Sequence, residues 1–506
     1  MALTKVTGGL LGNLPTGTGN VAVGDTALDS IESGATGNVA IGSAAGTALT
    51  VGDESVAVGF EALMTATTGA ENVGVGYRAL KLTTGNSNVA VGKNALATNS
   101  SASNNTAVGT NALTANTTGI DNVAVGSGAL DSNTTANDNI AIGRLALQAN
   151  TTGANNVAMG SSALYNNTTA SNNTAIGRSA LVANTTGSEN TAVGFQSLDA
   201  NTSGSNNIGM GYAALGSNTT GFRNVAIGSN NGALTTNTTG SDNVAVGADA
   251  LKANTTASNN TAVGKDALAA NTTGGNNVAV GYNAGTAVTT GSHNHCFGDF
   301  AGEKLTTGSS NVLLGRLSGA HNIYLATGSN NTLIGALTDT TAAGTDYANV
   351  IGYDVSGAGG YTTVGYSAQD SRLAAGGTTW ATISDERYKK DIVDSTAGLA
   401  FINALQPRTW KYKTLGELPE TFTAYKEGST EVFKNTQTNH GFIAQEVKAA
   451  IDADDSIKDG FRLWDDRDDG SQEVGEAALI PVLTKAIQEL STQLDAALAR
   501  IETLEG

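Results

Sequence analysis

The sequence predicts a mainly β protein, in which a long β-solenoid of short repeats precedes an α+β, helix-rich domain that ends in a coiled coil. Three observations support this. One phrase, Asn-Val-Ala-Val-Gly, a variable pair, Ala-Leu and Ala-Asn-Thr-Thr-Gly, recurs with variations over more than 300 residues. No proline, which would interrupt stacked strands, lies between Pro15 and Pro407. The three tryptophans, Trp380, Trp410 and Trp464, lie at or beyond the end of the repeats.

The repeat has a period of about 17 residues, which is typical of short solenoid coils. Val123, Ala124 and Val125 read as a short strand, with the two valines on one face and the alanine on the other. Gly126 permits a sharp turn, and Leu130 supplies a second apolar contact. A single coil cannot bury its apolar face, so we expect the coils to stack, with a rise of about 4.8 Å each.

The Asn-Thr-Thr-Gly part of each repeat, as at 116–119, has the composition of a turn, and we expect it to form a solvated ladder of turns. The interior of the coil should then be thin and built from Val, Ile, Leu and Ala. A thin coil buries little area, so several chains are expected to share one core. Three chains are favoured because a closed cyclic fibre stays monodisperse.

These repeats, from about Asn20 to Gly352, resemble the head repeats of trimeric autotransporter adhesins. Those heads are trimeric left-handed β-rolls, so the resemblance implies a homotrimeric shaft over 20–352. Residues 1–19 would be an N-terminal attachment segment, and 353–383 the distal end of the shaft with a linker.

Composition narrows the functional classes. The net charge of −18 makes nucleic acid an unexpected partner. Cys296 is the single cysteine, so no disulfide forms within the chain. The stretch Met1 to Asn13 has one lysine and no long apolar core, and it does not predict a secretion signal. No apolar run is long enough to predict membrane insertion.

At residue 384 the repeats give way to charged, aromatic-bearing sequence with three ordered blocks. The first is Ser384-Asp385-x-Arg387-x-Lys389-x-Asp391-Ile392, the second runs from Leu405 to Tyr412, and the third from His440 through Gly441, Gln445 and Glu446 to Val447. These blocks resemble the endosialidase-type intramolecular chaperone domain of bacteriophage tail fibres and tailspikes. The resemblance implies a domain over 384–478 that drives trimerisation and folding of the shaft and then cuts itself off.

The resemblance also implies a Ser-Lys dyad, with Ser384 as nucleophile and Lys389 as base; Lys390 is the alternative base. A serine hydroxyl reacts once a desolvated, partly neutral lysine takes its proton. The scissile bond would be Ser384-Asp385, with Ile383-Ser384 as the runner-up. From residue types alone, an exposed serine and lysine are usually just solvated.

Six further residues are assigned to the chaperone motif: Arg387, Asp391, His440, Gly441, Gln445 and Glu446. A lone histidine before a glycine is more often a turn or packing residue than a catalyst, so a supporting role is expected for His440. Gln445 and Glu446 are expected to make inter-chain hydrogen bonds or helix-start contacts.

The last segment, 479–506, is a coiled-coil candidate. Its apolar residues alternate spacings of four and three: Leu483, Ile487, Leu490, Leu494, Ala497, Ile501 and Leu504. The alternative is a single amphipathic helix that packs on its own domain.

Two places break the shaft rhythm. His293 and His295 are two apart, so on a strand they would share a face, and three chains could offer six imidazoles to a transition metal. Cys296 should face away from them. The alternative is two polar residues in an imperfect repeat, and no other cofactor is required.

Beyond the degraded repeats lie Tyr353, Tyr361, Tyr366 and Trp380. Aromatic residues anchor many recognition surfaces, including those for sugars. They predict a contact with a host cell-surface receptor, or alternatively rings that close the end of the core.

The leading hypothesis is therefore a phage tail fibre protein of the virion, made in the host bacterial cytoplasm. It would attach to tail or baseplate proteins through its N-terminus and mediate attachment to the host cell. Autoproteolysis is predicted, and activity on an external substrate is not.

A bacterial trimeric surface adhesin is the alternative, although the chain lacks a recognisable export signal or anchor. A polysaccharide-degrading tailspike is the third hypothesis. It would need paired carboxylates in a cleft, whereas Glu71, Asp121 and Glu189 are isolated.

Overall fold

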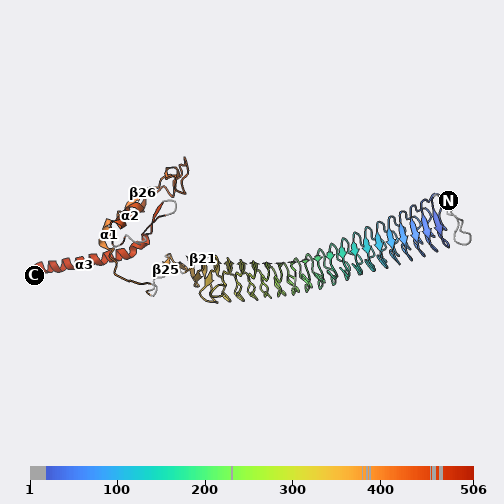
Figure 1. Cartoon of the computed structure of the whole chain (residues 1–506), viewed down its shortest axis with the longest axis horizontal. Coiled ribbons are helices and arrows are strands. Elements are labelled where there is room, and N and C mark those ends of the chain that lie inside the picture. The colour runs from blue at the N-terminus through green and yellow to red at the C-terminus, as the bar shows by residue number, and fades with distance from the viewer. Residues whose placement is uncertain are drawn as a thin grey trace. The chain divides into compact units, whose positions relative to one another are not determined.

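The computed structural model describes residues 19–229, 232–367, 369–378, 380–382, 386, 389–455, 457, 463–466 and 471–505. The expected N-terminal attachment segment lies almost wholly outside these residues. Contacts divide the chain into two compact units, 1–383 and 384–506 (Figure 1). Each unit is described by itself.

The first unit is a β-solenoid of about 20 turns, most of them 17 residues long (Figure 1). This confirms the predicted solenoid and its period.

Each turn contributes one short strand, and successive strands pair in parallel to form, among the described residues, a sheet of 23 strands. The last two strands, β24 and β25, pair antiparallel. The strands of this sheet are β1 (Val21–Val23), β2 (Val39–Ile41), β3 (Val56–Val58), β4 (Val73–Val75), β5 (Val89–Val91), β6 (Thr106–Val108), β7 (Val123–Val125), β8 (Ile140–Ile142), β9 (Val157–Met159), β10 (Thr174–Ile176), β11 (Thr191–Val193), β12 (Ile208–Met210), β13 (Val225–Ile227), β14 (Val244–Val246), β15 (Thr261–Val263), β16 (Val278–Val280), β17 (His295–Phe297), β18 (Val312–Leu314), β19 (Thr332–Ile334), β21 (Asn349–Tyr353), β23 (Tyr361–Tyr366), β24 (Gln369–Ala374) and β25 (Ala381–Thr382). Two short strands, β20 (Asp339–Thr340) and β22 (Ser356–Gly357), pair separately.

Each turn lies in register on the next. Ala124 of β7 stands opposite Ala141 of β8, so equivalent residues form columns along the rod. Hydrogen bonds between turns are not confined to the strands. The Leu113 N–H donates to the Ala129 carbonyl at 2.9 Å, and the Thr117 N–H donates to the Thr134 carbonyl at 2.9 Å. The backbone groups of the whole coil are thus satisfied largely by the neighbouring turns.

The interior of the rod is a column of alanine and leucine. Ala124 and Leu130 are fully buried, whereas Val123 and Val125 are only half-buried and point outward. The expectation that valine and isoleucine fill the interior is therefore wrong, and so is the expectation that one chain cannot close its own core. A 17-residue coil leaves room for a methyl group on the strand side and one leucine from the opposite side, so the larger β-branched residues lie outside.

The asparagines of the Asn-Thr-Thr-Gly segments are also buried, which corrects the prediction of a solvated ladder. Asn133 is fully buried, and its Nδ2 donates to Asn116 Oδ1 at 2.9 Å and to the Ala136 carbonyl at 3.1 Å. Asn150 Nδ2 in turn donates to Asn133 Oδ1 at 3.0 Å. A stack of identical amides satisfies itself, so these polar groups are accommodated in the interior.

Every turn contains residues in the left-handed region of backbone conformation. In the turn around β7 these include Asn111 at φ 56°, Leu113 at φ 54° and Asp121 at φ 59°. Each such residue costs about 1–2 kcal/mol. Gly126, at φ 137°, has no room for a side chain, since a Cβ there would lie 2.5 Å from the Gly143 carbonyl oxygen. An isolated turn is therefore unfavourable, and contacts with adjacent turns must offset the strain.

The second unit has an α+β fold, as predicted, but it is not helix-rich. Its described α-helices are α1 (Leu399–Ala404), α2 (Ala444–Asp452) and α3 (Leu479–Glu505). In the part of this unit that the structure describes, the strands form two antiparallel pairs, β26 (Arg408–Trp410) with β27 (Asn439–Gly441) and β28 (Trp464–Asp466) with β29 (Gln472–Val474). Short 3-10 helices span Leu415–Glu417 and Glu476–Ala478. Extended and turn segments make up much of the remainder.

The core of this unit forms where α1, α2 and the start of α3 meet. Its buried apolar residues include Phe401, Val447, Ile451, Leu463, Leu479 and Val482. The Leu399 N–H at the start of α1 donates to the Glu489 carboxylate at 2.8 Å, which ties α1 to α3.

The remainder of α3 exposes an apolar face: Leu490, Leu494 and Ile501 are 48–59% exposed. The helix therefore packs on its own domain only near its N-terminal end, and the coiled coil stays a prediction. Among the described residues, no helix combines the length and the apolar character needed to cross a lipid bilayer.

Candidate functional site

Two of the three motif blocks of the second unit meet in space. Strand β26 belongs to the second block and pairs with β27 of the third, which places Thr409 opposite His440. The Arg408 guanidinium then reaches the Glu446 carboxylate through two hydrogen bonds of 2.9 Å. This bidentate pair joins β26 to the first turn of α2, across 38 residues of sequence.

The ion pair shifts the pKa of both side chains. Hydrogen bonding from Arg408 holds the pKa of the Glu446 carboxyl below its usual range, and Glu446 raises the pKa of Arg408. Both side chains are partly exposed, so water screens the attraction, and the pair acts mainly to orient the strand against the helix. Glu446 also lies at the helix N-terminus, where a negative charge is favourable. The structure thus gives Glu446 a helix-start contact within one chain.

Packing requires a glycine at position 441, directly after His440. A Cβ on Gly441 would lie 2.9 Å from Cη2 of Trp410, so only glycine lets the indole approach β27. The His440 side chain is exposed. Gln445 is the second residue of α2 and lines the cavity described below together with this indole. The third block therefore serves to pack β26, β27 and α2 together.

The predicted reaction centre lies mostly outside the described residues. Ser384, Asp385 and Arg387 are among the residues not described, so the predicted nucleophile and scissile bond stay predictions. Lys389 is exposed, and its backbone N–H donates to the Glu386 carbonyl at 2.9 Å, which forms a local turn. Asp391 is exposed in a left-handed conformation at φ 55°.

Comparison with known families identifies this region. Residues 384–455 match the family described as chaperone of endosialidase. The match spans all three motif blocks and ends just beyond α2. No curated protein matches the chain, and no solved structure matches it. The second unit, called the chaperone domain below, therefore begins with a stretch similar to the endosialidase chaperone family, and the solenoid lies outside the match.

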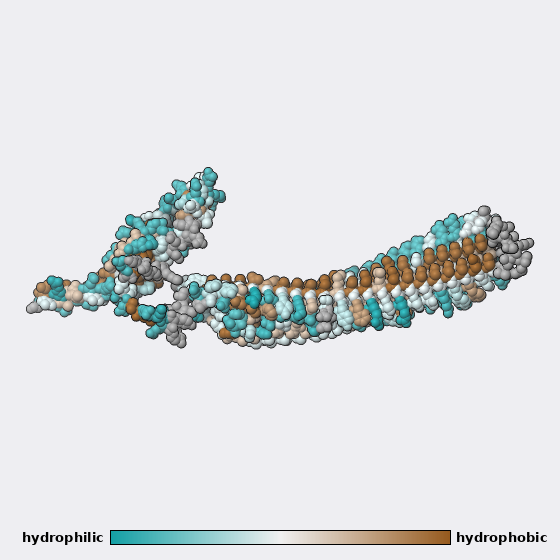
Figure 2. Space-filling view, in the orientation of Figure 1, coloured by the Kyte–Doolittle hydropathy of each residue, from teal (hydrophilic) through white to brown (hydrophobic). Residues whose placement is uncertain are grey.

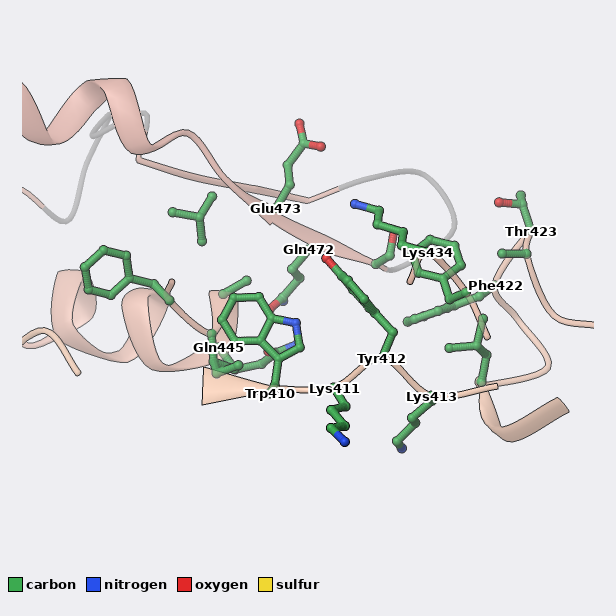
Figure 3. Close-up of a pocket in the computed structure, with 18 of the residues that line it drawn as sticks. Trp410, Lys411, Tyr412, Lys413, Phe422, Thr423, Lys434, Gln445, Gln472 and Glu473 are labelled. Atoms are coloured by element: carbon green, nitrogen blue, oxygen red, sulfur yellow. The ribbon is translucent and has the colours of Figure 1, made fainter. Parts of the chain in front are cut away.

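The chaperone domain contains a cavity of about 750 Å³ with an aromatic floor (Figure 3). Trp410 and Tyr412 present their rings to one side of the chain, while Lys411 and Lys413 leave on the other side. Phe433 lies edge-on to Tyr412 with ring centroids 5.8 Å apart. Such a lining favours the binding of apolar side chains.

The two shaft histidines do not share a strand. His295 lies in β17 and is exposed, whereas His293 precedes the strand in a left-handed conformation at φ 60°. The expectation that both project from one strand face is therefore wrong. Cys296 points into the interior as predicted, and burial raises the pKa of its thiol to about 12. The described residues contain no cluster of three or more metal-ligating side chains, and a metal shared between chains stays a prediction.

The predicted receptor residues are exposed. Tyr353 and Tyr366 stack with ring centroids 5.5 Å apart, the Arg372 guanidinium lies 5.7 Å from the ring centroid of Tyr361, and Trp380 is 51% exposed. The end of the core is formed instead by Val350 and Val355, together with neighbouring small residues. The receptor role of the aromatic residues stays a prediction.

Sequence reasoning missed a surface, the apolar stripe, defined here as the third residues of the shaft strands β1–β19 together with those first residues that are Val or Ile. Figure 2 shows it as a continuous row along the rod. Five third-position residues in the middle of the rod are 38–40% exposed: Ile142, Met159, Ile176, Met210 and Ile227. The signal was present, because this position is large and apolar in every turn, but it had been assigned to the interior.

Proposed function

We propose that this protein is a bacteriophage fibre or tailspike whose chaperone domain assembles three chains, sets their register and then cleaves itself off at Ser384. The observation that carries the proposal is the match of residues 384–455 to the endosialidase chaperone family, directly after a long solenoid of near-identical turns. The solenoid would then mediate attachment of the particle to the host cell, with the exposed aromatic residues near its end as receptor contacts.

The shaft gives a physical reason for a chaperone. Because equivalent residues recur every 17 positions, shifting one chain by a whole turn against another preserves nearly every contact between them. Such chains have many closely similar misaligned states. The left-handed residues of each turn add a cost that only stacked neighbours offset, so the first turns form slowly. A single-copy domain at one end can fix the register before the turns stack.

Two apolar surfaces support association of chains. The apolar stripe runs the length of the rod, and the exposed face of α3 continues to Leu504. Monomeric proteins rarely leave continuous apolar surfaces of this extent in water. Packing three stripes around one axis would bury them, while the α3 helices form a coiled coil. In this arrangement each chain closes its own core, and the stripe forms the trimer interface.

Cleavage chemistry depends on which bond breaks. Lys389 would accept the proton of the Ser384 hydroxyl, and Oγ would attack a carbonyl carbon, after which the amine leaves with a proton and water hydrolyses the ester. A serine Oγ cannot attack its own carbonyl without forming a four-membered ring. Cutting Ser384-Asp385 by this route therefore requires the serine of a second chain, whereas cutting Ile383-Ser384 can proceed within one chain through a five-membered ring.

Intact mass measurement tests the proposal. The wild-type chain should yield fragments ending and starting at the predicted bond, and a C-terminal fragment heavier by one serine would identify Ile383-Ser384 as the cleaved bond. Ser384→Ala and Lys389→Ala should remain full-length, while Lys390→Ala, as the matched control, should be cleaved. Sedimentation should give three shafts per particle. A well-folded single chain would contradict the trimer, and an uncleaved wild-type trimer would contradict autoproteolysis.

A further inference from the structure

The chaperone domain exposes an apolar pair near its start. Ile392 is 62% exposed and Val393 is 85% exposed, and acidic residues flank them at Asp391 and Asp394. In the described part of this domain, the other large apolar side chains that are exposed belong to α3 and to Phe433. Two adjacent β-branched residues in water forgo the favourable free energy of burying their apolar surface. The pair is therefore a candidate for docking into an apolar site.

The same domain holds a cavity of suitable size with an aromatic floor, and this pair does not line it. The cavity of about 750 Å³ lies over Trp410 and Tyr412. Gln472 forms part of its wall, and Oε1 of this residue is buried without a hydrogen-bond partner among the described residues. A buried acceptor left unpaired is unfavourable, because it has lost its hydrogen bonds to water without gaining a partner. A backbone N–H of an inserted segment is the kind of donor this wall lacks.

The charges around the cavity suit an acidic segment. Lys434 Nζ lies 5.5 Å from the ring centroid of Tyr412, whereas the Lys411 and Lys413 side chains leave on the opposite side of the chain from the rings (Figure 3). Glu473 and Glu476 also line the cavity, but the Glu473 side chain points away from the rings (Figure 3). The Lys434 ammonium therefore offers a positive charge to Asp391 or Asp394 beside the apolar pair.

We propose that Ile392 and Val393 of one chain dock in the aromatic cavity of a second copy of the chain. The inference rests on the proposed trimer, in which three such exchanges close a ring. Its consequence concerns cleavage. Lys389 lies three residues before Ile392, so docking would immobilise the predicted reaction segment only after a neighbouring chain has arrived. Assembly would then precede cleavage.

A designed disulfide tests the docking in the full-length protein. Val393→Cys is combined with Ala424→Cys, since Ala424 is half-buried in the cavity lining. Native Cys296 does not interfere, because its thiol is buried with a pKa raised to about 12. Mild oxidation should give covalent dimers and trimers on denaturing gels, which reduction reverses. Both positions follow the predicted cleavage point, so the links survive cleavage.

The matched control combines Val393→Cys with Ala453→Cys. Ala453 is exposed just after α2 and does not line the cavity, so this pair should give at least about tenfold less linked product. The single variants serve to show that each substitution leaves the trimer intact in sedimentation.

The outcomes separate the two proposals. A disulfide within one chain would show that the pair occupies its own cavity and would overturn exchange between copies. An intact trimer without the cross-link would overturn docking and leave the proposed function standing. A wild-type protein that sediments as a single chain would overturn both.

Discussion

The rod and the chaperone domain are stabilised in opposite ways. In the rod, contacts join equivalent residues of adjacent turns, as where the Leu147 N–H donates to the Ala163 carbonyl, and the same contact recurs along the chain. In the chaperone domain, single contacts join distant segments, with Arg408 bound to Glu446 and Leu399 bound to Glu489 over 90 residues. Each turn of the rod therefore repeats the contacts of the turn before it, whereas each of these contacts in the chaperone domain occurs at one place only.

This difference predicts how far damage spreads. A solenoid turn touches only its neighbours, so a defect should be local, because the remaining turns keep their own ladders. A small domain with one core unfolds as a unit, so a defect there should reach all of its elements. Paired substitutions in the two regions test this contrast.

The largest effect is expected for Phe401→Ala in the chaperone domain. Phe401 is 3% exposed in the core formed by α1, α2 and α3. Its truncation should cost about 3–5 kcal/mol and raise amide exchange across the whole domain, as measured by hydrogen-exchange mass spectrometry. Substituting the exposed Glu427 by alanine is the control and should change little. Exchange raised only around α1 would contradict a single cooperative core.

The matched change in the rod is Leu164→Ala. Leu164 is fully buried. Its truncation should lower the free energy of unfolding by about 2–4 kcal/mol, because apolar burial is lost and a cavity is left behind. Faster exchange should be confined to its own turn and the adjacent ones, because the neighbouring ladders stay intact. Asn166→Ala, at an exposed site of the same turn, is the control. Loss of protection along the whole rod would show that the solenoid melts as one unit and would remove the contrast.

A smaller effect is expected for Asn133→Ala, in the buried ladder. The change removes two hydrogen bonds donated by Asn133 and one of the two that Asn150 Nδ2 donates, so that Asn150 keeps only its bond to the Gly153 carbonyl. The cost should be about 1–3 kcal/mol, measured as a shift of the denaturant midpoint. Thr135→Ala, at the exposed position two residues on, should shift it by less. Equal shifts of the midpoint for the two variants would mean that the hydrogen bonds between the stacked asparagine side chains add nothing to stability.

These ladders also show what the sequence could predict and what it could not. The period, the strand and the turn glycine follow from local pattern, because each depends on spacing alone. Alternation in Val123-Ala124-Val125 predicts two faces but not which of them points inward. That choice depends on the width of the closed coil, which has room for Ala124 and not for valine. Asn133 was assigned to solvent by its polarity, because a column of mutually satisfied amides exists only once the turns are stacked.

The chaperone domain was found through its motif, and its contacts were not predictable. His440 to Val447 marks the family, yet nothing in the spacing shows that Glu446 binds Arg408 or that Glu489 caps α1. These partners lie far apart in sequence and occur once, so no periodicity indicates them. The apolar pair at Ile392 and Val393 could be read as exposed only after the core had been located.

The smallest effect is expected for Glu446→Gln. The stability change that it causes should depend on pH, whereas the change caused by Asn133→Ala in the rod should not. The folded-state pKa of Glu446 is lowered by Arg408, so the stabilisation it contributes is present above the ordinary glutamate pKa of about 4.3 and is lost as pH falls through the lowered value. At pH 7 the variant should melt slightly below wild type, and at a pH well below the lowered pKa of Glu446 the two melting curves should coincide. The pair is exposed, so high salt should also reduce the difference. The Asn133 ladder contains no titrating group, and the shift caused by Asn133→Ala should persist at both pH values. A Glu446→Gln difference that survived at low pH would mean that this side chain acts through packing rather than charge.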